Sequence, residues 1–321
     1  FTRVCVMPNT DPPLDSPESI RYTVDRGEEC PIHIHPIGAI TKSQNGKELT
    51  EMGAMLSEGA VAFSDDGSPV YDAELMRRAF EYCRMFDKPI LAHEEVLELS
   101  HGGVMNEGLV SMSLGLKGMP AAAEEVMIGR DIALADMTGG RLHVMHVSTA
   151  QGVDLIREAK ARGIRVTAEA CPHHFTLTDE SLRGFDSNFK MSPPLRTAKD
   201  VEGILAGIAD GTIDCIATDH APHAPEKKLL ELDRAPFGIL GLETAVGLSV
   251  MRLIESGRID WSRFVEAISL LPARILGVNR GTLRPGAVAD VTLIDPSREW
   301  QVNAESFASK SVNSPFDGWT L

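Results

Sequence analysis

Four residues that could hold a metal ion or move a proton follow short apolar runs in this chain: Asp66, His93, His146 and Asp219. Packing within a buried strand gives no reason for polar residues to gather at its end. Imidazole and carboxylate groups together are the donors that a catalytic zinc or a similar divalent ion prefers. A single such residue is more often a cap or a hydrogen-bonded core residue, so the prediction depends on all four occurring together.

The stretch from Ala217 to His223 suggests the chemistry that such a metal would support. A metal lowers the pKa of a bound water, and a nearby carboxylate can then take a proton from the water and return it to a leaving nitrogen. Asp219, which closes the apolar run 213–216, is the candidate for that carboxylate.

The elements that would position these residues alternate between strand and helix. Apolar runs predict strands over 3–7, 32–40, 60–64, 89–92, 142–145, 166–170 and 213–216. Helical spacing and capping residues predict helices over 17–26, 72–86, 120–135, 150–162, 199–209, 242–256 and 261–276. Polar residues at the ends of successive strands favour an α/β fold of the (β/α)8 TIM barrel type, with the first strand expected before Phe1. The alternative, a doubly wound open sheet, usually carries a glycine-rich phosphate turn that this sequence lacks.

Two segments depart from this alternation. Residues 96–119 form a long connection rich in glycine and methionine, which would suit a lid or a substrate-facing segment. Residues 281–295 combine turn residues with a β-branched run, which predicts strand without helix. We therefore expect a barrel domain over residues 1–278 and part of a small β-sandwich appendage over residues 279–321.

Composition limits the partners of this chain. Its 321 residues are 43% hydrophobic and carry a net charge of −15, which argues against nucleic acid or an anionic membrane surface as a partner. An anionic substrate must then be held by local cations. The five cysteines show no CxxC spacing, and there is no apolar run of about 18 residues, so we expect buried thiols in a cytoplasmic protein.

His33 and His35 form a second candidate metal pair on a predicted strand. Alternate residues of a strand face the same side, so both imidazoles could reach one ion. Pro36 and Gly38 follow directly, however, and no acidic residue lies nearby in the sequence. Alternating histidines can equally fill a barrel layer or an outer face, and we interpret the pair in that way.

Seven strand-end motifs resemble those of dihydroorotases, within the cyclic amidohydrolases. They are Met7-Pro8-Asn9-Thr10, Phe63-Ser64-Asp65-Asp66-Gly67, Ala92-His93-Glu94, His146-Val147-Ser148-Thr149, Pro193-Pro194-Leu195-Arg196, Thr218-Asp219-His220-Ala221-Pro222-His223 and Gly241-Leu242-Glu243-Thr244. The resemblance extends along the whole chain. It implies the zinc-dependent, reversible hydrolysis of L-dihydroorotate to N-carbamoyl-L-aspartate in pyrimidine biosynthesis.

The resemblance also implies roles for individual residues. His93 and His146 resemble zinc ligands, and Asp66 resembles the carboxylate that replaces a carboxylated lysine of relatives; Asp65 is the alternative. Asp219 resembles the catalytic carboxylate. The residues expected to contact substrate are Asn9, Ser192, His223, Phe237 and Gly238, where Ser192 stands at a position that is asparagine in many members. One tightly bound zinc is implied, and a second metal is not required.

Two departures from the family pattern leave alternatives open. The His-x-His ligand pair and the arginine that the family carries before the Asn9 motif are not in this sequence, and His33 and His35 follow that motif instead. We therefore expect a fragment cut at both ends that binds zinc poorly and turns over slowly. The alternatives are a hydantoinase or dihydropyrimidinase, and a non-catalytic partner of aspartate carbamoyltransferase. A homo-oligomer is also left open.

Overall fold

Parallel strands form the centre of the computed structural model, which describes all residues from Phe1 to Leu321. One sheet has the order β3 (Pro89–Ala92), β6 (Arg141–Val144), β7 (Val166–Ala170) and β8 (Cys215–Ile216). A second parallel pair joins β1 (Arg3–Val6) to β2 (His33–Pro36). Because Pro89 lies opposite Arg141 and Leu142 lies opposite Val166, β3, β6 and β7 end at one edge.

Phe63 connects these two sheets. It forms parallel bridges with Gly38 on one side and Ile90 on the other, so the strand predicted over 60–64 is reduced to single bridges. The Phe63 side chain is fully buried and therefore contributes to the core as well as to the wall. The wall of parallel strands runs from β1 through Phe63 to β8.

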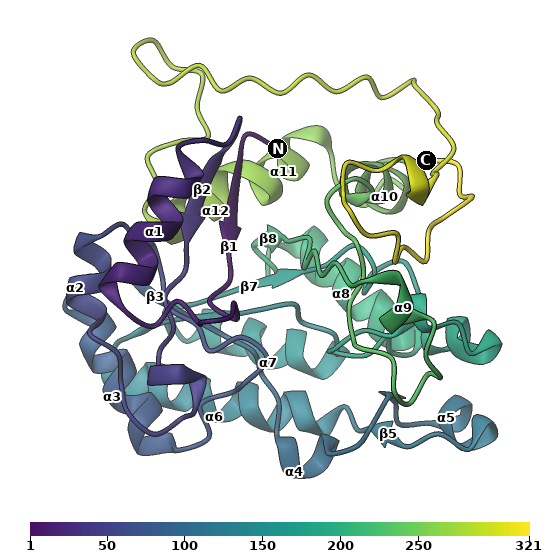
Figure 1. Cartoon of the computed structure of the whole chain (residues 1–321), viewed down its shortest axis with the longest axis horizontal. Coiled ribbons are helices and arrows are strands. Elements are labelled where there is room, and N and C mark those ends of the chain that lie inside the picture. The colour runs from purple at the N-terminus through teal and green to yellow at the C-terminus, as the bar shows by residue number, and fades with distance from the viewer.

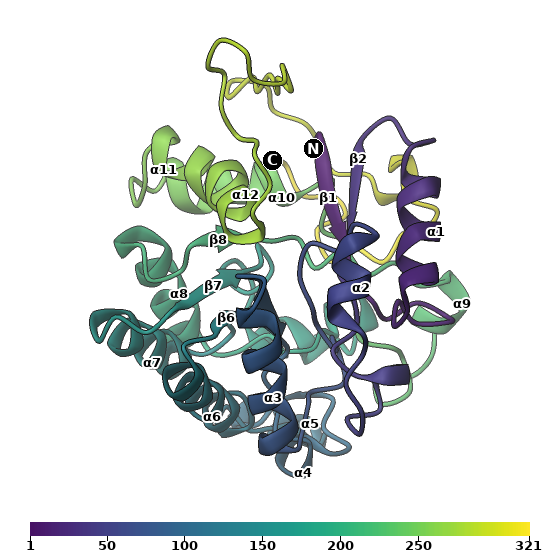
Figure 2. The ribbon, with the colours of Figure 1, turned by 90° about the vertical axis from the view of Figure 1, so that its left-hand side faces the viewer.

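Helices cover the outside of this wall, and Figure 2 shows them arranged around the strands. They are α1 (Pro17–Gly27), α2 (Met52–Ser57), α3 (Ala73–Arg84), α6 (Ala122–Thr138), α7 (Ala150–Ala161) and α8 (Ala198–Asp210). Side chains of Ser16, Asp72 and Thr149 accept backbone N–H groups at the starts of α1, α3 and α7. The core packs strand residues such as Val144 against helix residues such as Ile128.

The chain after β8 is helical as predicted. The short α9 (Pro225–Lys228) precedes α10 (Ala245–Ser249), which a π-helical turn extends to Ile254. α11 (Trp261–Val265) and α12 (Leu271–Leu276) are joined by a second π-helical turn. No helix in the chain combines the length and the apolar character needed to cross a bilayer.

The long connection 96–119, predicted as a lid or a substrate-facing segment, has secondary structure of its own. It folds into α4 (Leu97–Ser100), β4 (Met105–Asn106), α5 (Leu109–Leu114) and β5 (Gly118–Met119), with β4 and β5 paired in parallel. The Asn106 side chain donates to Asp179 at 2.9 Å and accepts from Arg196 at 3.1 Å. Buried apolar residues and these bonds fix the segment against the barrel.

The strand predicted over 291–295 is wrong. Residues 279–300 contain neither helix nor strand, and Figure 1 shows the segment extended away from the helices. Leu293 is 92% exposed, and no other strand forms backbone hydrogen bonds with the run 291–295. Residues 301–321 return to the barrel, where Val302 and Phe316 are buried. The division at residue 278 stays a prediction.

Candidate metal centre and active site

Asp66, His93 and His146 come together at the shared edge of the strands. His93 Nδ1 lies 3.0 Å from His146 Nε2, and Asp66 Oδ1 lies 3.8 Å and 3.9 Å from these two nitrogens. Both histidines are buried, while Asp66 is partly accessible. Two imidazole nitrogens on a tetrahedral zinc lie about 3.3 Å apart, so the donor types and the spacing fit such an ion.

Neighbouring side chains orient this group. Glu95 Oε2 lies 2.9 Å from His93 Nε2 and accepts a hydrogen bond from it, which leaves the lone pair on Nδ1, 3.0 Å from His146 Nε2. Asn9 donates from Nδ2 to Asp66 Oδ2 at 3.0 Å. His146 has a φ of +30°, a strained backbone conformation of the kind that persists at functional sites.

The charges of the group favour cation binding. Burial lowers the pKa of His146, but the neighbouring carboxylate of Asp66 and the charge of Asp219 more than offset this and raise it to about 9. Burial raises the pKa of Asp66, yet the neighbouring His146 and the charge of His93 hold it below the ordinary value. In the absence of a metal, a proton on His146 takes the place of the cation.

The Asp65 carboxylate binds the chain at Ile40 and Thr41 and not the two histidines. It accepts from the backbone N–H groups of Ile40 at 2.8 Å and Thr41 at 3.1 Å, and from the Thr41 hydroxyl. Asp65 and Asp66 point in opposite directions, as consecutive residues of an extended chain do. Asp65 therefore fixes the chain after β2, and Asp66 is the one of the pair that faces the histidines.

Asp219 follows β8 and has a φ of +43°, in the left-handed region that few non-glycine residues adopt. Burial and the charges of Asp66 and Glu169 raise the pKa of its carboxyl to about 6, although His146 and His93 act in the opposite direction. A carboxyl that titrates near neutral pH can both take and return a proton.

Hydrogen bonds hold His223, Phe237 and Gly238, which are expected to contact substrate, in place. His223 Nε2 donates to the Phe237 carbonyl at 2.6 Å. Gly238 has a φ of +143°, and a Cβ there would lie 2.6 Å from His223 Nε2, so only glycine allows this approach. The Gly238 carbonyl accepts from Lys228 at 3.1 Å and from Asn313 at 3.1 Å, and its amide donates to the Lys190 carbonyl.

Ser192, His33 and His35 form no hydrogen bond with Asp66, His93 or His146. Ser192 is partly exposed, in the segment that His174 anchors through a hydrogen bond to the Pro193 carbonyl. His35 Nε2 lies 3.3 Å from Arg3, which forms a 2.6 Å ion pair with Asp290. His33 is exposed on β2.

Known proteins resemble this chain over its whole length. The family model described as "Dihydro-orotase-like" matches residues 1–152. A dihydroorotase from Pelotomaculum thermopropionicum is 55% identical over 321 residues, which are 100% of this chain and 75% of that protein. A dihydroorotase from Citrifermentans bemidjiense is 52% identical over 100% of this chain and 76% of its own length. The chain belongs to the dihydroorotase family.

Solved structures extend this relation to other cyclic amide hydrolases. The L-hydantoinase (dihydropyrimidinase) of Arthrobacter aurescens matches with a TM-score of 0.88 at 25% identity, over 100% of this chain and 74% of that one. A dihydropyrimidinase from Brevibacillus agri matches with a TM-score of 0.83 at 21% identity, which shows the fold. These relations confirm the predicted α/β barrel, the family and the enzyme class.

The candidate site contains residues that the sequence did not single out. Glu95 could have been found, because it follows His93 closely and a carboxylate commonly orients a ligating histidine. Asn313 could not, because it comes from the returning tail; it accepts from the His223 amide at 3.2 Å and donates to the Ala221 carbonyl at 2.9 Å. Long-range contacts of this kind leave no local signal.

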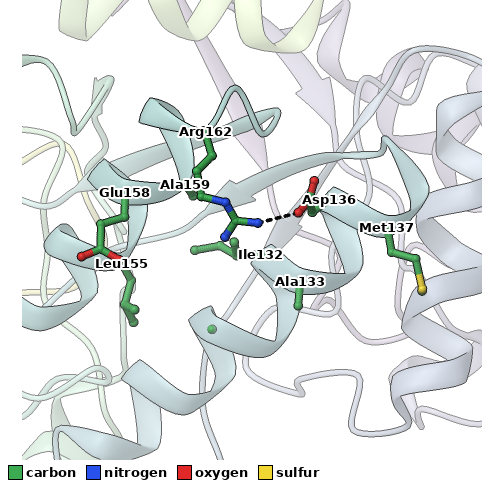
Figure 3. Close-up of a pocket in the computed structure, with 9 residues that line it drawn as sticks. Ile132, Ala133, Asp136, Met137, Leu155, Glu158, Ala159 and Arg162 are labelled. Atoms are coloured by element: carbon green, nitrogen blue, oxygen red, sulfur yellow. Dashed lines mark hydrogen bonds and ion pairs between the residues drawn. The ribbon is translucent and has the colours of Figure 1, made fainter.

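One cavity lies away from this site. It measures about 490 Å³ and lies on the outside of the barrel between α6 and α7, where Ile132, Met137 and Leu155 line it (Figure 3). Arg162 and Asp136 form a 2.7 Å ion pair across it. None of the strand-end residues lines this cavity.

Proposed function

We propose that this dihydroorotase catalyses the zinc-dependent, reversible conversion between L-dihydroorotate and N-carbamoyl-L-aspartate in pyrimidine biosynthesis. The observation that carries the proposal is the convergence of Asp66, His93 and His146 beside Asp219. These residues come from four separate strand ends, and a scaffold has no physical need to bring them together.

Asp66, His93 and His146 would hold one zinc ion, because two imidazoles and a carboxylate are typical zinc donors. A zinc bound there would polarise the ring carbonyl and lower the pKa of water. Glu95 keeps His93 in the tautomer that can donate its Nδ1 lone pair, and Asn9 holds the Asp66 carboxylate.

Asp219 would carry the proton. In hydrolysis its carboxylate accepts a proton from water as the water oxygen bonds to the ring carbonyl carbon. The carbon–nitrogen bond then breaks, and Asp219 donates the same proton to the departing ring nitrogen. In cyclisation the proton moves in the opposite direction, from the carbamoyl nitrogen to the departing oxygen. A pKa of about 6 suits both halves of this transfer.

Substrate recognition would fall to a few polar groups. The second amide hydrogen of Asn9 can bind the substrate carboxylate, since the first is used on Asp66. A carboxylate beside His223 Nδ1 would favour the imidazolium form, which makes a stronger, charge-assisted bond. Both backbone groups of Gly238 are already bonded, so the Phe237 amide is the better candidate for the ring contact. Ser192 would add a hydroxyl contact.

The net charge and the anionic substrate bear on the location and the partners of the enzyme. Its substrate is a small anion, and a net charge of −15 supports a cytoplasmic enzyme without a nucleic-acid or membrane partner. A homo-oligomer or a complex with aspartate carbamoyltransferase is compatible with the exposed helices outside the barrel.

Replacing Asp219 tests the mechanism. In the full-length protein we expect Asp219→Asn to lower kcat by about 10²- to 10⁴-fold, the usual value of general acid–base catalysis, while zinc content stays the same. The matched control is Asp210→Asn, which alters a carboxylate at the end of α8. Unchanged kcat in Asp219→Asn would refute its role as proton carrier.

The likeness to L-hydantoinase supports hydantoin hydrolysis as a second candidate activity. Comparing kcat/KM for dihydroorotate and for hydantoins decides between them, because the site proposed here must favour the substrate that carries a carboxylate. Equal or higher kcat/KM for uncharged hydantoins would overturn the assignment. A protein with no turnover of either ring, yet bound to aspartate carbamoyltransferase, would instead be a non-catalytic partner.

A further inference from the structure

A second group of metal-type donors lies in the turn directly after β7. Cys171, His173 and His174 are all buried, and one donor atom from each lies within 4.8 Å of the others. The ring centroids of the two histidines are 4.3 Å apart at 61°. None of these residues belongs to the group formed by Asp66, His93 and His146.

Two ring nitrogens of this turn, one from each histidine, lack hydrogen-bond partners. His174 Nε2 lies 2.8 Å from the Pro193 carbonyl, which can only accept, so Nε2 carries the proton and Nδ1 carries a lone pair. His174 Nδ1 and His173 Nε2 are both buried without a hydrogen bond. An unsatisfied buried polar group costs about 1 to 3 kcal/mol, so two in one turn need an explanation.

His143 shows how a histidine without a ligand is accommodated in the same barrel. It is buried on β6, yet Nδ1 lies 2.8 Å from the Thr167 hydroxyl and Nε2 lies 3.1 Å from Glu169. Both of its ring nitrogens are therefore bonded. Among the other buried histidines, only His146, itself a candidate metal ligand, also has an unpaired ring nitrogen.

The charge around the turn also favours a cation. Burial first, and then the charges of Asp219, Glu169 and Asp66, raise the pKa of Cys171 and so disfavour a bare thiolate. A divalent ion would reverse that balance, since it attracts the thiolate and the carboxylates together. Thiolate and imidazole donors are the combination that zinc prefers.

We propose that Cys171 Sγ, a ring nitrogen of His173 and His174 Nδ1 bind a zinc ion separate from the one at Asp66. Sulfur and nitrogen on a tetrahedral zinc lie about 3.5 Å apart, so the donors need to approach by about 1 Å. Binding releases the Cys171 thiol proton to solvent. Because His174 bonds the Pro193 carbonyl, the ion would also fix the segment that carries Ser192.

Cobalt provides a selective test, because a cysteine ligand gives Co²⁺ a thiolate charge-transfer band in the near ultraviolet. The Asp66 group contains no sulfur and cannot produce this band. The test uses full-length protein with the exposed Cys5 and Cys30 changed to serine. We expect the band in this parent. Cys171→Ser should lose the band together with one equivalent of bound cobalt. Cys215→Ser, which changes another buried cysteine, should keep the band.

A variant of the other site separates the two proposals. His93→Ala should lose cobalt from the Asp66 group and activity, but keep the thiolate band. A cobalt-loaded parent without the band, or a band that survives in Cys171→Ser, would overturn the proposal. X-ray absorption of the unmutated zinc protein avoids any folding defect: a sulfur neighbour at about 2.3 Å is expected, and a spectrum with only nitrogen and oxygen neighbours would contradict it.

Discussion

The two donor groups at the carboxyl ends of the strands are built in different ways. Asp66, His93 and His146 come from three separate strand ends, so their spacing depends on the register of the whole sheet. Cys171, His173 and His174 come from one four-residue turn. The group assembled from several strands keeps a partly accessible carboxylate beside Asp219, whereas the group within the turn is closed off from solvent.

This difference assigns the chemistry to one group and a structural role to the other. A catalytic metal needs an open position, while a structural metal is enclosed by its ligands. Changes to the first group should therefore affect turnover far more than changes to the second. The predictions below test that contrast.

The largest expected effect is the difference between two variants, each of which removes one ligand from one of the two groups. His146→Ala should lower kcat/KM for dihydroorotate by more than about 10³-fold, beyond the 10- to 100-fold typical of residues that only orient a ligand. His174→Ala should lower it by less than about 10-fold, because it acts through the Ser192 segment. Steady-state kinetics on both variants checks this. Equal losses would remove the distinction between the two groups.

The metal-free protein should show the next largest effect, as a pH dependence of stability. The folded pKa of His146 is about 9, above its ordinary value of 6.5. Its contribution is therefore complete below pH 6.5 and is lost as pH rises through 9, a change of about 3 kcal/mol. Urea unfolding at several pH values measures it. A His146→Gln variant that kept the same slope would contradict the assignment.

Asp219 contributes in a different pH window. Its folded pKa of about 6 exceeds its ordinary value of 3.8, so the stability it adds is complete below pH 3.8 and is lost by pH values above 6. The two groups therefore titrate in separate ranges, and the slope above pH 6.5 reports on His146.

Glu95→Gln should weaken metal binding by about 10- to 100-fold, because the amide no longer fixes the charge and tautomer of His93. Competition with a chelator measures the affinity. Glu98→Gln is the matched control, since Glu98 is exposed on α4 close by in the sequence. If both variants bound metal as the unchanged protein does, Glu95 would have no part in the site.

The smallest effect is expected at His33 and His35. Replacing both with asparagine should change zinc content and kcat/KM by less than about 2-fold, as surface substitutions away from a site usually do. His33 is exposed, and His35 contacts Arg3 on the neighbouring strand. Loss of one equivalent of zinc from this variant would show that the pair binds metal after all.

The sequence could predict the parts of the fold that depend on local patterns. β3 spans the predicted residues, and α1, α3 and α7 begin at the predicted residue or within one residue of it. Apolar runs, helical spacing and capping residues are local, so they survive in any context. The candidate ligands were found in the same way, because each follows a recognisable strand.

The rest depended on partners far away in the sequence. The run 291–295 has strand composition, but nothing in the chain pairs with it. The connection 96–119 is folded because Asn106 meets Asp179 and Arg196, which come from two later segments. Cys171, His173 and His174 were visible in the sequence, but their unpaired nitrogens became evident only when every neighbour had been placed.

The central claim is that Asp66, His93 and His146 share one zinc ion beside Asp219. Anomalous diffraction at the zinc edge, from crystals of the full-length zinc-loaded protein, tests it most directly. We predict a peak within about 2.0 to 2.2 Å of one donor atom from each of the three residues, with Asp219 facing it. Zinc found only elsewhere in the crystal, with these three side chains unligated, would contradict the account.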